Sequence, residues 1–590
     1  MIWRQIRMIR FGLAAPLVLR LAICSLTTLG LAVPAAAADP ASAGANAPAG
    51  PRAMALGLAG VEDWSVQQPF IDVMKSARTW IGHRPGQWGG QGEHDLIAQG
   101  ILDPDGWPKV IPTSLRGIGT VVLTDLPETA LSLAGRYRLK FDGEGIVEVS
   151  GRATRIRYAP GEVRFDFTPG PGPVIVTIKR TDRRKTGDHV RNISIVKLDN
   201  LERYNAGEVF NPDWIARIKG FGTVRLMDWM NTNETLLSDW SDRPRPDDYT
   251  FTGGGVPIEI MVQLANTLDA NPWFTMPHRA TDSYIKSFAE YVRDALDPAL
   301  ISYVEYSNEV WNWHFPQSVW VEQQAQARWG VEYAWMQYYG LRSAQMAEIW
   351  KQAFGTAAAT RLVTVISTQT GWLGLEQDVL HAPRWVDEAP GSNLPPADQV
   401  DAYAVSGYFG GILGTPEWAP TVREWLAESR TKAERQADNQ GLEGAARADY
   451  VAARKFDTAI EIAARQLRDG SVTGDPTDSL ADLIGTTFAY HADVAQSHGL
   501  ELIMYEGGSH VAGVADVVDD DELTEFFVAL NYTPQMGALY TELLNGWRNA
   551  GGRLFNVFVD VVQPGKWGSW GALRDLGDQN PRWDALIGFN

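Results

Sequence analysis

The sequence feature that most restricts the fold is a series of short apolar segments alternating with segments of helical periodicity. Eight of them have the length and composition of buried strands: 53–60, 223–229, 271–277, 302–309, 361–369, 401–409, 501–507 and 555–561. Regular alternation of strands and helices is typical of a parallel sheet in the α/β class, and eight units are typical of a closed (β/α)8, or TIM, barrel. The sequence therefore predicts this barrel as the main domain.

A doubly wound open sheet is the alternative, because it satisfies the same alternation with six or seven strands. Such sheets often bind dinucleotides through a glycine-rich turn after a strand. No pattern of this kind follows any of the predicted strands. The sequence therefore favours the barrel.

Residues 101–200 interrupt the alternation with several short β-patterned segments separated by Gly, Pro and Asp turns. Short strands at this spacing indicate a β-sandwich. We expect an inserted module of jelly-roll type, with a sugar-binding, packing or lid role. Residues 53–100 then hold the first strand and the start of the barrel. Residues 201–590 complete the barrel and carry a helical insertion at about 412–499.

The N-terminus has the pattern of a secretory signal peptide: a basic start, an apolar run and small residues up to Ala38. We expect residues 1–38 to be removed and residues 39–52, rich in Ala, Gly and Pro, to form a disordered leader. Arg20 interrupts the apolar run, which argues against a stable membrane anchor. The pattern predicts a secreted or periplasmic protein.

Composition excludes several kinds of site. The single cysteine, Cys24, lies in the predicted signal, so the mature chain would have no disulfide, thiolate metal site or thiol nucleophile. The histidines show no closely spaced zinc-binding pair, and we expect neither a metal nor a cofactor. The net charge is −19, and removal of the four signal arginines would make it four units more negative. Nucleic acid is therefore a poor partner.

Two glutamates end predicted strands, and strand ends are where (β/α)8 barrels place their active sites. Glu309 ends the fourth strand and Glu506 ends the seventh. Cleavage of a glycosidic bond uses one carboxyl that is protonated near neutral pH and one that is ionised. The sequence predicts Glu309 as acid/base and Glu506 as nucleophile.

Asn308-Glu309 at the end of strand four, with Glu506 at the end of strand seven, resembles the clan A glycoside hydrolases. The stretch 303–312 is also similar to a poorly characterised group of secreted bacterial proteins, so no sugar specificity is implied. The clan often has proline after Asn-Glu, where this chain has Val310. The resemblance implies a (β/α)8 barrel, retention of anomeric configuration and an Asn308 contact to the sugar 2-hydroxyl.

The same resemblance implies that other strand-end residues position the sugar or tune the carboxylates. Four tryptophans are added to this set, because tryptophan stacks on sugar faces and these four lie at or after the ends of predicted strands. The predicted substrate-binding set is Asn308, Arg225, His278, Tyr408, Trp229, Trp311, Trp567 and Trp570.

Glu305 alternates with Glu309 and should point into the barrel, where a buried carboxylate needs a partner. Arg225 is the candidate, and it could have that structural role alone.

Three functions fit these residues. The first is a retaining glycoside hydrolase acting on a polysaccharide or oligosaccharide. The second is a transglycosylase, which uses the same residues. The third is a non-catalytic carbohydrate-binding protein that handles exopolysaccharide. The presence of both glutamates favours an enzyme.

Overall fold

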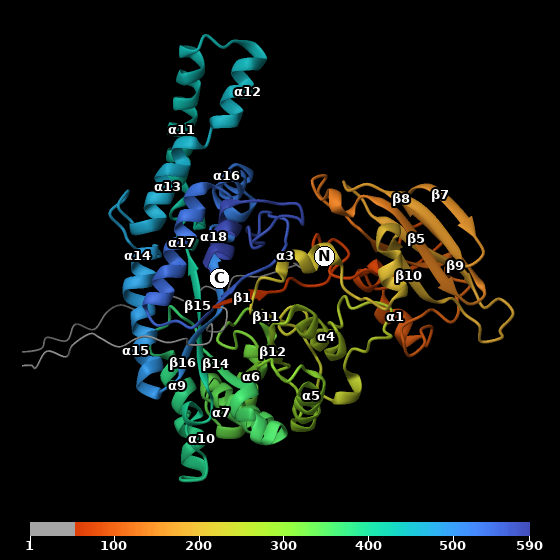
Figure 1. Cartoon of the computed structure of the whole chain (residues 1–590), viewed down its shortest axis with the longest axis horizontal. Coiled ribbons are helices and arrows are strands. Elements are labelled where there is room, and N and C mark those ends of the chain that lie inside the picture. Colours follow the sequence, from red (N-terminus) through yellow and green to blue (C-terminus); the bar gives the residue numbers. More distant parts are fainter. Residues whose placement is uncertain (1–52, 590) are drawn as a thin grey trace, which may run out of the picture. The chain divides into compact units, whose positions relative to one another are not determined.

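The computed structural model describes residues 53–589 and contains a closed barrel of eight parallel strands (Figure 1). In barrel order they are β1 (Met54–Gly57), β11 (Thr223–Arg225), β12 (Asn271–Met276), β13 (Ser302–Tyr306), β14 (Leu362–Ser367), β15 (Ala402–Phe409), β16 (Glu501–Ser509) and β17 (Leu554–Val557). Each strand falls on one of the eight predicted segments, so the predicted barrel is confirmed. The predicted signal peptide, the leader 39–52 and Cys24 lie outside the described residues.

Helices follow most of the barrel strands. The principal ones are α3 (Pro212–Ile218), α4 (Ile258–Leu268), α5 (Asp282–Ala295), α6 (Pro316–Trp329), α7 (Trp335–Phe354), α9 (Leu375–His381), α10 (Pro383–Glu388), α16 (Asp521–Asn531), α17 (Pro534–Asn549) and α18 (Pro581–Phe589). Three shorter ones are α1 (Glu93–Ala98), α2 (Leu201–Asn205) and α8 (Ala358–Arg361). Across residues 53–589, none of the helices combines the length and apolar character needed to cross a membrane.

Helix α5 illustrates why these segments are helical. The Thr281 side chain caps its first turn by accepting a hydrogen bond from the backbone N–H of Tyr284. The buried residues recur at helical spacing and face the barrel. They are Tyr284, Ile285, Phe288, Ala289 and Val292.

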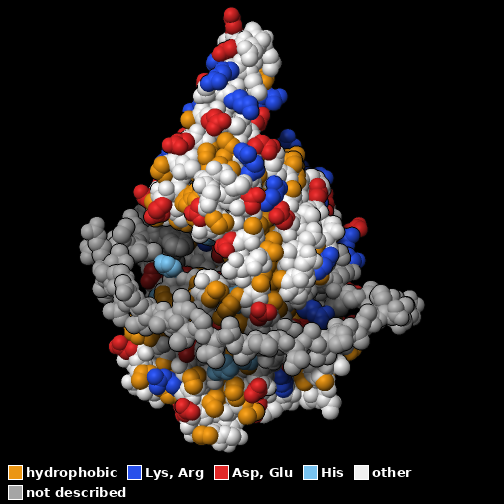
Figure 2. Space-filling view, turned by 90° about the vertical axis from the view of Figure 1, so that its left-hand side faces the viewer, with side chains coloured by type: hydrophobic (Ala, Val, Ile, Leu, Met, Phe, Trp, Pro, Cys, Tyr) orange, Lys and Arg blue, Asp and Glu red, His pale blue; other side chains and the backbone are white. Residues whose placement is uncertain are grey.

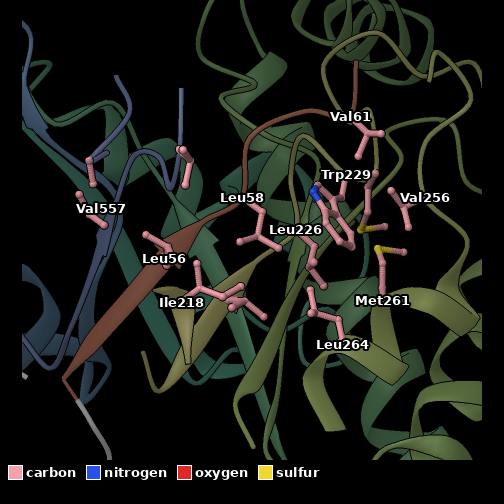
Figure 3. Close-up of a cluster of buried hydrophobic side chains, with 14 of the residues drawn as sticks. Leu56, Leu58, Val61, Ile218, Leu226, Trp229, Val256, Met261, Leu264 and Val557 are labelled. Atoms are coloured by element: carbon pink, nitrogen blue, oxygen red, sulfur yellow. The ribbon is translucent and has the colours of Figure 1, made fainter. Parts of the chain in front are cut away.

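Alternation along the strands separates two layers of side chains. One cluster of buried residues takes members from seven of the eight strands, which is possible only inside the barrel; it includes Ala55, Trp273, Tyr303, Ile503 and Tyr505. Residues between them in sequence belong to the larger cluster beneath the helices. Figure 3 shows part of that outer cluster, with Leu56, Leu58, Ile218, Leu226, Trp229, Met261 and Leu264.

Strand β16 contains one extra residue. Met504 pairs with Val405 of β15, and the next pair joins Glu506 to Ser406, which leaves Tyr505 unpaired. The pairing of β16 with β17 shifts at the same place, between Met504 and Gly507. Such a β-bulge interrupts alternation. Tyr505 and Glu506 are adjacent, yet both reach the inside of the barrel.

Between β1 and β11 the chain forms two antiparallel sheets. One has the order β10 (Arg191–Lys197), β5 (Gly135–Asp142), β8 (Glu162–Phe167), β7 (Thr154–Ala159). The other has the order β3 (Gly90–Gln91), β2 (Ile81–His83), β4 (Gly117–Val122), β9 (Val174–Thr181), β6 (Gly145–Gly151). The expected sheet module is present. Strands β2 and β3 lie before residue 101, where the insertion was predicted to start. The prediction missed them because they are too short to show the alternation of a strand.

Helices α11 (Ala419–Asn439), α12 (Gly444–Arg454), α13 (Asp457–Asp469), α14 (Leu480–Asp482) and α15 (Ala489–His498) lie between β15 and β16. Helices α11 and α12 project beyond α13 as a hairpin (Figure 1). Helix α12 has no buried residue. The surface of the hairpin mixes acidic and basic side chains (Figure 2).

Candidate active site

The site is centred on Arg225, the last residue of β11, which is buried in the barrel opening. Its guanidinium donates to Glu506 Oε1 at 2.9 Å, to Glu305 Oε2 at 2.9 Å and to Asn308 Oδ1 at 2.8 Å. A planar guanidinium can bridge several acceptors at fixed angles, which an ammonium group cannot do. Arg225 therefore ties the ends of β11, β13 and β16 together. The predicted pairing of Arg225 with Glu305 is confirmed.

Glu506 lies within β16, just after the bulge, and is 5% exposed. Besides its ion pair with Arg225, its Oε2 accepts a hydrogen bond of 3.0 Å from the Tyr408 hydroxyl. Burial raises the pKa of Glu506, while Arg225 and Tyr408 oppose that rise. Both contacts favour the ionised carboxylate.

The side-chain amide of Asn308 has a fixed orientation. Arg225 can only donate, so the amide oxygen faces it and the NH2 group points away. Asn308 Nδ2 donates to Asn233 Oδ1 at 3.0 Å, and Gln317 donates to that same oxygen and to the Asn308 backbone carbonyl. An amide NH2 group has two hydrogens, so Asn308 retains a second donor for a ligand hydroxyl.

Glu309 lies beyond the end of β13, in a loop with unusual backbone geometry. Ser307 has φ of 61° and Glu309 has φ of 41°, in the left-handed region that non-glycine residues rarely adopt. Asn312 donates to Glu309 Oε2 at 3.0 Å, and the Tyr505 hydroxyl lies 3.4 Å from Oε1. Backbone strain of this kind is found at sites where side-chain placement matters more than stability.

The two glutamates interact electrostatically. Burial, followed by the charge of Glu506, raises the pKa of Glu309 to about 8. Arg225 forms its ion pair with Glu506, and Glu309 has no ion pair within residues 53–589. A proton shared by the pair therefore resides on Glu309 near neutral pH.

A third carboxyl group, Asp228, follows β11, and sequence reasoning missed it. Burial, followed by the charge of Glu506, raises the pKa of Asp228 to about 7. The only signal in the sequence is its position three residues after Arg225. Asn233 and Gln317 gave no signal, because each lies in a loop or helix distant in sequence from a strand end.

Asn312 and Tyr505 were also missed, although both lie close to the predicted glutamates. Asn312 is three residues after Glu309, and Tyr505 immediately precedes Glu506. In a regular strand Tyr505 and Glu506 would point to opposite faces. Strand periodicity alone therefore allows only one of the two to face the inside of the barrel.

His278 is only 2% exposed. The Tyr306 hydroxyl donates to its backbone carbonyl at 2.6 Å, and Trp320 packs against its ring at 5.4 Å. Burial lowers the pKa of His278 to about 4, so the ring is neutral at physiological pH. The surrounding side chains leave His278 little surface for a ligand.

Trp229 was predicted to bind substrate, but it is 1% exposed and lies in the cluster of Figure 3. Its indole N–H donates to the Ala59 carbonyl at 3.1 Å, and Trp214 stacks on it at 5.8 Å. Strand β11 ends at Arg225, earlier than predicted, and the chain then turns Trp229 into the core. No face of this indole is open to a sugar.

The other predicted tryptophans lie at the surface or partly buried. Trp570 packs at 5.9 Å from Tyr408 and at 5.1 Å from His510, which brings it beside the hydroxyl that contacts Glu506. Trp567 is 54% exposed. Trp311 is partly buried and lines a pocket with Asn312.

In the described range 53–589, no group of three or more His, Cys, Asp or Glu side chains is arranged to hold a metal ion.

No family model matches the chain, and no curated protein matches it. Among solved structures, the chain is similar to a GH51 arabinofuranosidase from Xanthomonas axonopodis pv. citri, with 11% identity and a TM-score of 0.32. That match covers 64% of this chain and 65% of the arabinofuranosidase, which is less than two thirds of its length. A GH5-4 broad-specificity endoglucanase from Clostridium acetobutylicum matches with 11% identity and a TM-score of 0.32, covering 64% of this chain and 90% of that one.

A fungal β-1,4-galactanase matches with 8% identity and a TM-score of 0.33, covering 66% of this chain and 96% of that one. The eight parallel barrel strands of this chain close in sequence order, with Glu309 just beyond the fourth strand and Glu506 within the seventh. The protein thus has the architecture of a (β/α)8 barrel.

Proposed function

We propose that the protein is a retaining glycoside hydrolase that cleaves a polysaccharide or oligosaccharide. The observation that carries the proposal is the unequal environment of the two glutamates. Glu506 is paired with Arg225, whereas Glu309 has a pKa raised to about 8 by burial and by the charge of Glu506. One ionised and one protonated carboxyl at the barrel opening are what glycosidic cleavage needs.

In the first step, Glu309 gives its proton to the glycosidic oxygen while Glu506 attacks the anomeric carbon. The bond between that carbon and the oxygen breaks, the leaving group departs as an alcohol, and the sugar is bound to Glu506 as an ester. In the second step, ionised Glu309 takes a proton from water. The water oxygen attacks the anomeric carbon, and the Glu506 carboxylate is released.

Neighbouring residues support these steps. The free hydrogen on Asn308 Nδ2 suits a hydrogen bond to a sugar hydroxyl next to the reacting carbon. Tyr408 and Arg225 fix both oxygens of Glu506, so the attacking carboxylate is held in one orientation before substrate binds. The signal-peptide pattern of residues 1–38 supports action outside the cytoplasm, on glycans in the periplasm or the medium.

The test is sugar release from a broad panel of polysaccharides by the wild type and by Glu506→Ala, each checked for folding by circular dichroism. We expect release by the wild type and none by the variant. Proton NMR of the first product should show the anomeric configuration of the substrate. Equal release by both proteins, or an inverted first product, would contradict the assignment.

Two related functions are distinguished by the same experiment. A transglycosylase would give products longer than the substrate. A carbohydrate-binding protein would release no sugar from any glycan, and a binding screen on the same panel would then detect it.

A further inference from the structure

Three tryptophans form a connected group beside the acid/base loop. Trp313, in the loop after β13, is 44% exposed, and Trp372, in the loop after β14, is 51% exposed. Trp335 at the start of α7 is buried between them, with ring distances of 5.0 Å to Trp313 and 6.1 Å to Trp372. We call these three residues the tryptophan platform. The buried middle ring fixes the two exposed indoles.

The platform borders a pocket of about 700 Å³ lined by residues 311–314, 369 and 371–373. Its walls combine indole faces with polar groups from Asn312, His314 and Gln369. Within residues 53–589, Gln369 Oε1 and Trp311 Nε1 are buried without a hydrogen-bond partner. Apolar faces bordered by donors and acceptors complement a pyranose ring, which has an apolar face and a rim of hydroxyls.

Asn312 connects this pocket to the chemistry, since it lines the pocket and also donates to Glu309. The acid protonates the oxygen of the leaving group, and the nucleophile attacks from the opposite side of the anomeric carbon. The pocket adjoins the acid, so it lies on the side where the leaving group departs.

A second pocket, of about 480 Å³, lies on the far side of the opening. Its lining includes residues 59–60 after β1, residues 561–564 after β17 and the half-exposed Trp64. In the barrel order, β1 and β17 are opposite β13 and β14. A glycan crossing the opening would therefore meet an exposed tryptophan on each side of the glutamate pair.

Resting on the proposed function, we propose that the tryptophan platform binds pyranose units of the leaving group, so that the enzyme cleaves within a glycan chain. The occupant is a chain of pyranose rings, because a single sugar would leave one of the two exposed indoles uncovered. Release of single sugars from the non-reducing end would use the platform but leave the pocket at Trp64 empty, whereas cleavage within the chain uses both sides of the opening.

Binding tests this inference without turnover. Full-length Glu506→Gln protein, alone and with Trp313→Ala or Trp372→Ala added, is titrated by calorimetry with cello-, manno-, xylo- and maltohexaose. We expect each tryptophan change to weaken binding of at least one hexasaccharide by about tenfold.

The matched control is Trp88→Ala, which removes a tryptophan of 55% exposure from the loop between β2 and β3 and should leave affinity unchanged. Unchanged affinity in both platform variants, or no binding of any hexasaccharide at millimolar concentration, would overturn the proposal.

Turnover then separates the platform from the chemistry. On a substrate from the polysaccharide panel, the platform variants should lose about tenfold in kcat/KM. On a nitrophenyl glycoside of the same sugar, which places no sugar on the platform, they should stay within about twofold of the wild type. Equal losses on both substrates would overturn the platform and leave the hydrolase assignment intact. No turnover of either substrate by the wild type, with platform-dependent binding retained, would overturn the hydrolase and keep the platform as a glycan-binding site.

Discussion

Strands β13 and β16 each position one glutamate at the barrel opening, and the two side chains have different surroundings. Glu506 lies inside its strand and is held by a buried arginine and a tyrosine hydroxyl. Glu309 lies beyond its strand in a strained loop, where Asn312 donates a hydrogen bond of 3.0 Å to it. The comparison shows how the placement of one cation makes the two carboxyls unequal: the ion pair with Arg225 favours the ionised form of Glu506, whereas burial without an ion pair raises the pKa of Glu309 to about 8.

The largest expected effect comes from removing each glutamate in turn. Glu506→Ala should lower kcat by about 10⁴-fold or more on every substrate, since no other group replaces the nucleophile. Glu309→Ala should lower kcat by about 10²–10⁴-fold on glycans. It should retain far more activity on a dinitrophenyl glycoside, whose leaving group departs without a proton. Steady-state kinetics on both substrates provide the measurement. A reversed pattern would exchange the two roles.

The next effect concerns the cation. Arg225→Lys keeps the charge but cannot bridge Glu305, Glu506 and Asn308 together, so we expect kcat to fall by about 10²-fold. The matched control is Arg342→Lys in α7, which alters an ion pair with Asp282 and contacts neither Glu309 nor Glu506. If both lysine variants had wild-type kinetics, the three-way bridge would not be what orients the nucleophile.

The pH dependence measures the unequal protonation directly. Because Glu309 must be protonated to act as the acid and its pKa is raised to about 8, kcat/KM on a glycan should fall as the pH rises through that value. The fall should approach about tenfold per pH unit. With Glu309→Gln acting on a dinitrophenyl glycoside, this alkaline fall should disappear. Its persistence would assign the titration to another group, and Asp228 would be the first to examine.

The smallest effect compares two tyrosine hydroxyls. Tyr408 donates to Glu506 at 3.0 Å, whereas Tyr505 lies at the longer distance of 3.4 Å from Glu309. We expect Tyr408→Phe to lower kcat by about tenfold and Tyr505→Phe by about twofold. Each change removes one oxygen, so each variant is the control for the other. Equal losses would mean that the two carboxyls depend equally on their tyrosines.

Much of the barrel could be predicted from the sequence, because strand–helix alternation reports directly which residues are buried. The pairing of Arg225 with Glu305 followed from the same alternation, since both side chains point inward, from β11 and β13, which β12 separates. Apolar alternation does not predict a strand or a side-chain position where exposure to solvent or packing in the core decides it. Strand β7 is mostly exposed, so it shows no apolar alternation, and it was not predicted. Trp229 follows a strand end, yet core packing decides its position.

The site residues divide in the same way. Glu309 and Glu506 were predicted from their strand ends, and their catalytic roles stay proposals. Asn233 and Gln317 required the folded chain, because Asn233 reaches Asn308 from a loop 75 residues away and Gln317 reaches it from the following helix, neither at a strand end. The pKa of Glu309 also depends on burial and on a charge from another strand, neither of which a local motif encodes.

Strand β16 contains one residue more than regular pairing with β15 requires. The bulge allows Tyr505 and Glu506, which are adjacent in sequence, to point inward together. Loss of any single residue from Leu502 to Met504 would restore regular pairing with Glu506 still opposite Ser406 and facing inward, but Tyr505 would then face outward, toward the helices. In-frame loss of one codon there would therefore keep the carboxylate in the barrel opening and remove the Tyr505 hydroxyl from Glu309.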